Sequence, residues 1–130
     1  YAQQPLAKQM KFTAGYFSKY AYGTATNNEI NCENAEISTK GFLGLYGVFA
    51  NQNKPVKDYK IVTVKQNKVN INNSYISANS GYLEVFGGYP MYGTATLNEV
   101  NINSSNFTAL CDMKICGGFV QYAGDATSKP

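Results

Sequence analysis

The chain has 130 residues, of which 44% are hydrophobic, which is enough for the apolar core of one domain. Its formal net charge is +3, and all 11 basic residues are scattered lysines. Without arginine, the usual bidentate reader of phosphate and guanine, we expect no nucleic-acid partner. The sequence has no histidine, its three cysteines lack the spacing of metal ligands, and no apolar run approaches ~20 residues. We therefore expect no metal, no other cofactor and no direct insertion into a membrane.

The sequence repeats itself. Residues 22–26 read Tyr-Gly-Thr-Ala-Thr and return as residues 92–96, and each copy precedes a similar patterned segment, at residues 28–32 and 98–102. A third copy of that segment occupies residues 67–71. Repetition at intervals of about 20–50 residues is typical of proteins whose units stack on one another.

Each patterned segment alternates apolar with polar residues, as in Glu29-Ile30-Asn31-Cys32, which predicts a strand with one buried face. The alternation then slips at residues 33–34, 72–73 and 103–104, which are mostly asparagine. Asparagine tolerates left-handed and turn conformations, so these positions predict a corner followed by a second short strand.

The rest of the unit is repeated as well. Residues 41–47 match residues 81–87 without a gap, residues 111–117 form a further copy, and an incomplete copy opens the chain near Met10. An aromatic residue closes each copy, namely Tyr16, Phe49, Tyr89 and Phe119. The longest step between these aromatics predicts an insertion at roughly residues 51–65.

This pattern predicts an all-β fold, a β-solenoid of about three to four coils. We place the coils at about residues 10–49, 50–89 and 90–119, with a partial coil at the end. Residues 1–130 then form a single repeat segment, which we expect to be a fragment of a longer solenoid.

Stacking of the copies predicts ladders of equivalent side chains. Asn31, Asn70 and Asn101 fall into one ladder, in which side-chain amides can bond to one another. Beside it, Glu29, Lys68 and Glu99 alternate in charge, and Glu84 falls opposite Lys114. The residues that we expect to be buried and stacked are Val69, Ile71, Val100, Ile102, Leu43, Leu83, Leu45, Val85 and Ile115.

The cysteines take positions that other copies fill with packing residues. Cys32 occupies the place of Ile71, which predicts a small buried apolar side chain. Cys111 and Cys116 are close in the sequence, so two alternatives remain for them: a local disulfide in an oxidising compartment, or two unpaired packing residues.

The sequence offers little for catalysis. Glu29 and Glu99 could pair as the carboxylates of a glycosidase, but stacking would place them two strand spacings apart, about 9–10 Å, with Lys68 between them. A charge ladder explains them better. We therefore expect no enzyme activity and no catalytic residues.

Three motifs together carry a family resemblance: the Gly-Gly-aromatic turns at residues 87–89 and 117–119, the Gly-Thr-Ala-Thr segment at 93–96, and Asn-Glu-Val-Asn-Ile at 98–102. This combination resembles the repeats of bacterial autotransporter-type surface proteins. The resemblance implies a right-handed parallel β-helix that is exported and held at the bacterial cell surface, anchored in the outer membrane through a region that this chain lacks. It implies a non-catalytic scaffold for adhesion or self-association, whose partner is a host-surface glycan or protein, or another copy.

Two regions are candidates for ligand binding. The insertion carries Lys54, Lys57, Asp58 and Tyr59, and its basic character suits an anionic glycan or an acidic protein patch. Tyr89 and Tyr92 belong to an aromatic strip at the turns that could stack on sugar rings. The alternatives are a solvated loop for the insertion and core-capping aromatics at the turns. The alternative for the whole chain is a compact all-β carbohydrate-binding, lectin-like module in which the repeats are hairpins.

Overall fold

The structure is a computed structural model, and it describes residues 8–52 and 61–122. Within these ranges the chain forms 13 β-strands and no helix, so the prediction of an all-β fold is confirmed. No helix that could cross a membrane occurs in the described part of the chain. All nine strand pairs within the same ranges are parallel.

The strands form four sheets, and each sheet collects strands from equivalent places in the repeat. Sheet A contains β1 (Gln9–Phe17), β5 (Phe42–Ala50), β9 (Leu83–Pro90) and β13 (Met113–Gly118). Sheet B contains β2 (Gly23–Thr26), β6 (Val62–Lys65) and β10 (Gly93–Thr96). Sheet C contains β3 (Glu29–Glu33), β7 (Lys68–Asn72) and β11 (Glu99–Asn103). Sheet D contains β4 (Glu36–Thr39), β8 (Tyr75–Ala78) and β12 (Asn106–Ala109).

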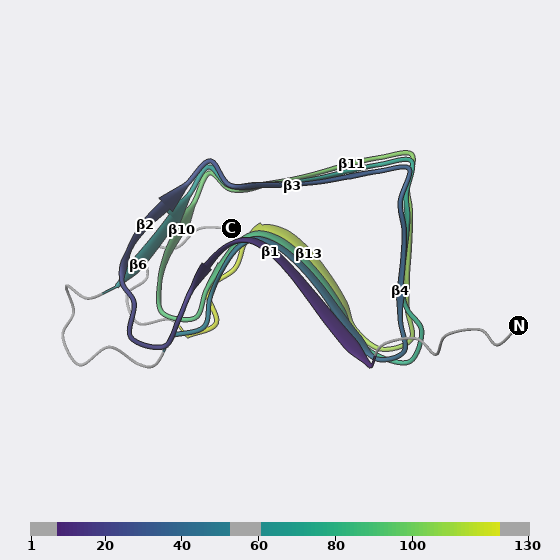
Figure 1. Cartoon of the computed structure of the whole chain (residues 1–130), viewed down its shortest axis with the longest axis horizontal. Coiled ribbons are helices and arrows are strands. Elements are labelled where there is room, and N and C mark those ends of the chain that lie inside the picture. Colours follow the sequence, from purple (N-terminus) through teal and green to yellow (C-terminus); the bar gives the residue numbers. More distant parts are fainter. Residues whose placement is uncertain (1–7, 53–60, 123–130) are drawn as a thin grey trace, which may run out of the picture.

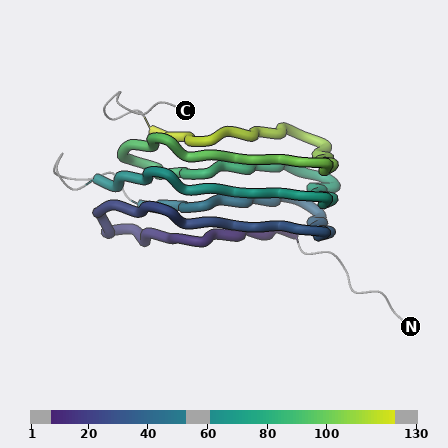
Figure 2. The backbone as a smooth tube through the Cα atoms, turned by 90° about the horizontal axis from the view of Figure 1, so that it is seen from above, coloured from purple at the N-terminus to yellow at the C-terminus, as the bar shows by residue number. Residues whose placement is uncertain are grey.

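The chain visits the sheets in a fixed order, A, B, C and D, and then returns to sheet A. Figure 1 shows equivalent strands lying over one another in one view. Figure 2, turned by 90°, shows the same segments as layers placed one above the next. Each layer therefore pairs with its neighbours through backbone hydrogen bonds between parallel strands.

The pairing register follows the sequence repeats. Asn70 of β7 pairs with Asn31 on one side and with Asn101 on the other, as the ladder predicted. Ile71 lies between Cys32 and Ile102 in the same sheet. The repeats thus set which residues stack, because identical inward and outward positions align only in this register.

The extent of the insertion was predicted wrongly. Residues 62–65, which we assigned to the insertion, form strand β6 in the middle of sheet B. Val62 pairs with both Gly23 and Gly93. The alternating Val-Thr-Val-Lys pattern meets the requirement for a strand, although its side chains differ from Gly-Thr-Ala-Thr.

Two corners of each layer are built by residues with positive φ. At the corner between sheets C and D these are Asn34, Asn73 and Ser104, with φ of 53°, 49° and 50°. The predicted corner is therefore confirmed. A second set, Asn27, Gln66 and Leu97, turns the chain between sheets B and C.

Sheet A bends where it approaches sheet C. The strand pairing skips Gly47, Gly87 and Gly117, and a Cβ atom on Gly87 would lie 2.6 Å from the carbonyl oxygen of Gly117 and 2.7 Å from the backbone nitrogen of Glu99. Only glycine fits this backbone contact. Figure 1 shows sheet A arching toward the strands of sheet C at this point.

The bend divides the interior into two apolar clusters. The larger cluster lies between sheets A, C and D and contains the predicted core residues Leu43, Leu45, Val69, Ile71, Leu83 and Val85, all 0% exposed. The smaller cluster lies between sheets A and B, around Val48 and Val64. The cores of both clusters come from the middle layers, where neighbours cover each side chain from both sides.

Three predicted core residues are less covered. Val100 is partly buried, whereas Ile102 and Ile115 are 41% and 38% exposed. Both isoleucines lie on β11 and β13, which are the outermost strands of sheets C and A among the described residues. The prediction of full burial was therefore wrong for Val100, Ile102 and Ile115, because no described strand stacks beyond β11 or β13.

A buried row of asparagines lies at the corner that leads into sheet C. Asn67 is 0% exposed. Its amide group donates to Asn98 Oδ1 at 2.9 Å and to the carbonyl oxygen of Ala25 at 3.1 Å, and its Oδ1 accepts from the backbone N–H and the side-chain amide of Asn28. This row satisfies corner backbone groups that would otherwise be buried without a partner.

Candidate functional site

The four loop residues that we predicted to bind ligand, Lys54, Lys57, Asp58 and Tyr59, lie outside the described residues. Their role stays a prediction.

Tyr89, which we predicted on an exposed aromatic strip, is buried on the outer face of sheet A. The outer face of sheet A is concave at its bend and is filled by an aromatic cluster of Tyr46, Phe49, Phe86 and Tyr89. Tyr89 is 8% exposed, and its ring is 5.0 Å from Phe49 and 5.4 Å from Phe119, measured between ring centroids. Its hydroxyl donates to Gln121 Oε1 at 2.7 Å. The ring of Tyr89 therefore packs the concave face and is closed to a ligand in this structure.

Charged residues of sheet A surround this aromatic cluster. Glu84 and Lys114 occupy paired positions, as predicted, but they meet other partners. Glu84 accepts a 2.7 Å hydrogen bond from the Tyr46 hydroxyl, and the Lys114 Nζ lies 5.5 Å from the centre of the Phe119 ring. These contacts make the cluster a structural element of the outer face.

The buried tyrosines predict a loss of stability at alkaline pH. Burial, with the nearby Glu84 carboxylate, raises the pKa of Tyr89 to about 12, and burial with the Glu84 hydrogen bond also raises the pKa of Tyr46. Because the unfolded chain releases these protons near pH 10, their contribution is complete below pH ~10 and is lost as the pH rises toward 12. For Tyr89 this amounts to about 2–3 kcal/mol.

We expect denaturant unfolding of the Tyr89→Phe variant to lose less stability than the wild type between pH ~10 and 12. Lysine deprotonation affects both proteins equally, so their difference isolates the tyrosine. Parallel stability curves for the two proteins would contradict this expectation.

Tyr92 lies at the turn after sheet A and stacks on Tyr122. Their ring centroids are 4.8 Å apart with an interplanar angle of 19°, and the two residues form an isolated parallel bridge. Tyr122 is 46% exposed and Tyr92 is half-buried. Of the two predicted turn tyrosines, Tyr92 is the more accessible.

Cys111 and Cys116 are free thiols in the structure, so the disulfide alternative is absent from it. Cys116 lies on β13, and Cys111 precedes that strand. Cys32 is buried, as predicted, and burial raises the pKa of its thiol.

Glu29 and Glu99, the two carboxylates considered for a glycosidase pair, lie on either side of a lysine. Glu29 and Glu99 flank Lys68 in sheet C, and the Lys68 Nζ lies 3.8 Å from Glu99 Oε2. Across the described ranges, no group of three or more His, Cys, Asp or Glu side chains could hold a metal ion.

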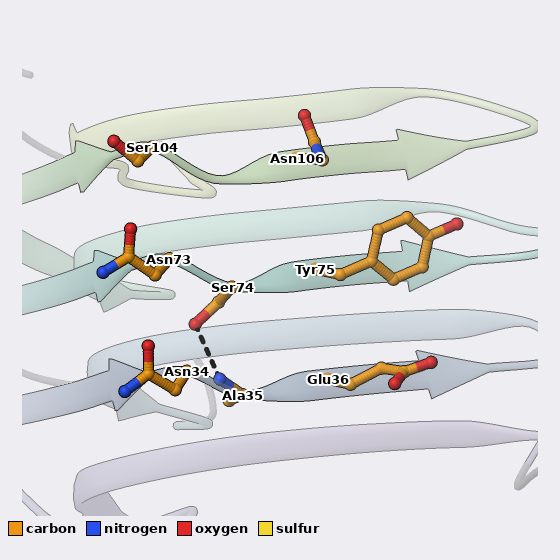
Figure 3. A pocket seen from close by; sticks show the side chains of 8 residues that line it. All are labelled: Asn34, Ala35, Glu36, Asn73, Ser74, Tyr75, Ser104 and Asn106. Carbon is orange, nitrogen blue, oxygen red and sulfur yellow. Dashed lines mark hydrogen bonds between the residues drawn. The ribbon is translucent and has the colours of Figure 1, made fainter.

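A trough with a volume of about 440 Å³ runs along the corner between sheets C and D. It is lined by Asn34, Ala35, Glu36, Asn73, Ser74, Tyr75, Ser104 and Asn106. Figure 3 shows that neighbouring layers contribute the corner residue and the first residue of the following strand, with Ala35 and Ser74 between these positions in two of the layers. We call this feature the corner trough.

The first residues of the strands place an aromatic ring between two polar groups. Glu36, Tyr75 and Asn106 are directly paired across β4, β8 and β12. Tyr75 is 42% exposed, and Figure 3 shows its ring on the middle strand, with Glu36 and Asn106 on the strands on either side. The ring offers an apolar face to solvent, flanked by a carboxylate and an amide.

Most polar side chains of the trough differ from the asparagine ladder of sheet C. In that ladder, Asn31, Asn70 and Asn101 bond to one another at 2.9 Å. Within the trough, Ser74 Oγ accepts from the backbone N–H of Ala35 at 3.1 Å, and Ser104 Oγ donates to Asn103 Oδ1 at 3.5 Å. In contrast, the side chains of Asn34, Asn73, Glu36, Tyr75 and Asn106 have no hydrogen-bonding partner in the described part of the chain. They are available to a ligand.

Sequence reasoning missed this trough. It found the corner at residues 33–34, 72–73 and 103–104 but treated it as a structural turn. A usable signal was the second position after that corner, which changes from Glu36 to Tyr75 to Asn106, while the next position stays apolar as Ile37, Ile76 and Phe107.

Comparison of the chain with protein-family models, curated proteins and solved structures finds no match.

Proposed function

We propose that the chain is a right-handed parallel β-helix segment of an exported bacterial surface protein and acts as a non-catalytic scaffold for adhesion. The corner trough is the observation that carries this proposal. The Asn31, Asn70 and Asn101 ladder bonds to itself, whereas the trough presents amides, a carboxylate and an aromatic ring that have no hydrogen-bonding partner among the described residues. Such a surface suits recognition of a host glycan or protein.

Adhesion to a different molecule is favoured over end-to-end self-association. If a second copy continued the stack in the same register, Glu99 of one copy would face Glu29 of the next, and Lys114 would face Lys11. Like charges directly opposite one another on neighbouring strands destabilise the pairing. The exposed Ile102 and Ile115 still favour some contact between copies, but the charges oppose a regular one.

The second candidate function is carbohydrate binding by a compact, lectin-like module. Its fold would require hairpins, in which neighbouring strands are antiparallel. All strand pairs in residues 8–52 and 61–122 are parallel, which favours the stacked arrangement.

The test is an adhesion panel. Beads coated with the protein are passed over immobilised host glycans and extracellular-matrix proteins, with beads carrying heat-denatured protein as the control. We expect saturable retention on at least one glycan or protein surface. Retention on none of them, or equal retention of the denatured protein, would contradict an adhesive function.

A further inference from the structure

We propose that the corner trough binds an uncharged saccharide, laid across the layers with one ring stacked on Tyr75. This inference deepens the proposed adhesive function and rests on it. It assigns the recognition to one surface and one chemical class of ligand.

The chemistry of the lining selects that class. An exposed aromatic ring provides a flat apolar face for the C–H face of a sugar, and the 42% exposed Tyr75 is the ring that the trough offers. Sugar hydroxyls both donate and accept hydrogen bonds. The amides of Asn34 and Asn73 can do both, and Glu36 accepts.

The charge of the lining excludes anionic glycans. Glu36 is the one charged residue among those that line the trough, and its charge is negative. A sulfate or carboxylate on the ligand would meet no cation there and would be repelled by Glu36. The preference is therefore opposite to that of the basic insertion, which suits an anionic partner.

The repeat spacing determines how the ligand lies. Equivalent corner residues of neighbouring layers are one strand spacing apart, about 4.8 Å, so three layers offer polar groups over about 9.6 Å. Figure 3 shows Asn34, Asn73 and Ser104 in one column and Glu36, Tyr75 and Asn106 in a second column beside it. A saccharide that runs along the stack meets both columns, whereas a single ring meets only part of them.

The experiment is an NMR titration of the isotopically labelled full chain. The uncharged probes are chito-, cello-, malto- and mannotetraose, and the anionic probe is a heparin tetrasaccharide. We expect at least one uncharged probe to shift the signals of Asn34, Asn73 and Tyr75 while those of sheet A stay in place. Shifts caused by heparin alone, or no shift of the trough signals by any probe, would overturn the proposal.

Two variants with matched controls assign the contacts. Tyr75→Ala should weaken the affinity about tenfold, or ~1.4 kcal/mol, whereas Tyr20→Ala, which removes an 85% exposed tyrosine outside the trough, should leave it unchanged.

Asn73→Gly removes an amide at a positive-φ corner that glycine accepts, and should weaken the affinity about three- to fivefold. Gln66→Gly likewise removes an amide side chain at a positive-φ corner, but outside the trough, and should leave the affinity for the saccharide unchanged.

If Tyr75→Ala does not fold, Asn73→Gly carries the test. Undiminished affinity in the folded trough variants would overturn the inference. If the adhesion panel shows retention on a matrix protein and no saccharide shifts the trough, this inference fails while the adhesive function stands. If nothing is retained on the panel, the proposed function fails as well.

Discussion

Replacing Asn67 by alanine is expected to destabilise the fold by about 3–5 kcal/mol, because several buried polar groups would lose their partner together. The Asn67 side chain is fully buried and bonds to the carbonyl oxygen of Ala25, to Asn98 Oδ1 and to the backbone N–H of Asn28. Alanine satisfies none of these groups and leaves a cavity too enclosed for solvent to compensate well. Denaturant unfolding followed by circular dichroism measures the change.

The matched control is Asn70→Ala in the neighbouring ladder. Asn70 makes two side-chain hydrogen bonds of 2.9 Å, but both lie on the solvent side of sheet C. Water can replace them, so we expect a loss of about 0.5–1 kcal/mol. Similar losses for both variants would show that burial does not distinguish the two rows.

Replacing Gly87 by alanine is expected to cost about 3–5 kcal/mol, since the added methyl group meets backbone rather than movable side chains. The new Cβ would lie 2.6 Å from the Gly117 oxygen and 2.7 Å from the Glu99 nitrogen. Relief requires sheet A to move away from sheet C, which would open both apolar clusters. Thermal unfolding compares this variant with the wild type.

Gly15→Ala serves as the control for that substitution. A Cβ at Gly15 would lie 3.1 Å from a methyl group of Val48 and 3.2 Å from the Asn28 side chain, so it meets side chains at longer distances rather than backbone. We expect a loss below about 1.5 kcal/mol. A Gly87→Ala protein as stable as Gly15→Ala would contradict the close contact of sheets A and C.

The sequence predicted the stacking register well, for a physical reason. Repeated residues such as Asn31, Asn70 and Asn101 gain from meeting one another, so sequence alignment of the copies and spatial pairing of the strands coincide. The corner at Asn34 and Asn73 was predicted on similar grounds, since few residues accept a positive φ.

Strand β6 escaped prediction because backbone pairing requires no side-chain identity. Val62 and Val64 are paired with Gly23 and Ala25 but differ from them in side chain, so the repeat is not visible as identical residues.

The burial of Tyr89 was not predicted for another reason. The bend at Gly47 and Gly87 makes the outer face of sheet A concave, so its outward aromatics become covered.

The sequence marks the position of the corner trough through the change from Glu36 to Tyr75 to Asn106, but it does not predict that the site is open to a ligand, because that depends on which polar side chains remain unpartnered. Asn31 and Asn34 look equivalent in the sequence, yet Asn31 bonds within its ladder and the Asn34 side chain finds no partner in the described part of the chain. Asn31 lies within strand β3 and is paired directly with Asn70, whereas Asn34 lies outside the strands, at the corner, with a φ of 53°.

Competition during adhesion tests most directly whether binding occurs through the corner trough. Protein-coated beads are retained on the surface found in the adhesion panel while the free oligosaccharide that shifts the trough signals is added in increasing amounts. We predict that retention falls over the same concentration range in which the trough becomes occupied, and that Tyr75→Ala beads are poorly retained from the start. Retention that persists at full occupancy of the trough, equally for wild-type and Tyr75→Ala beads, would contradict this conclusion.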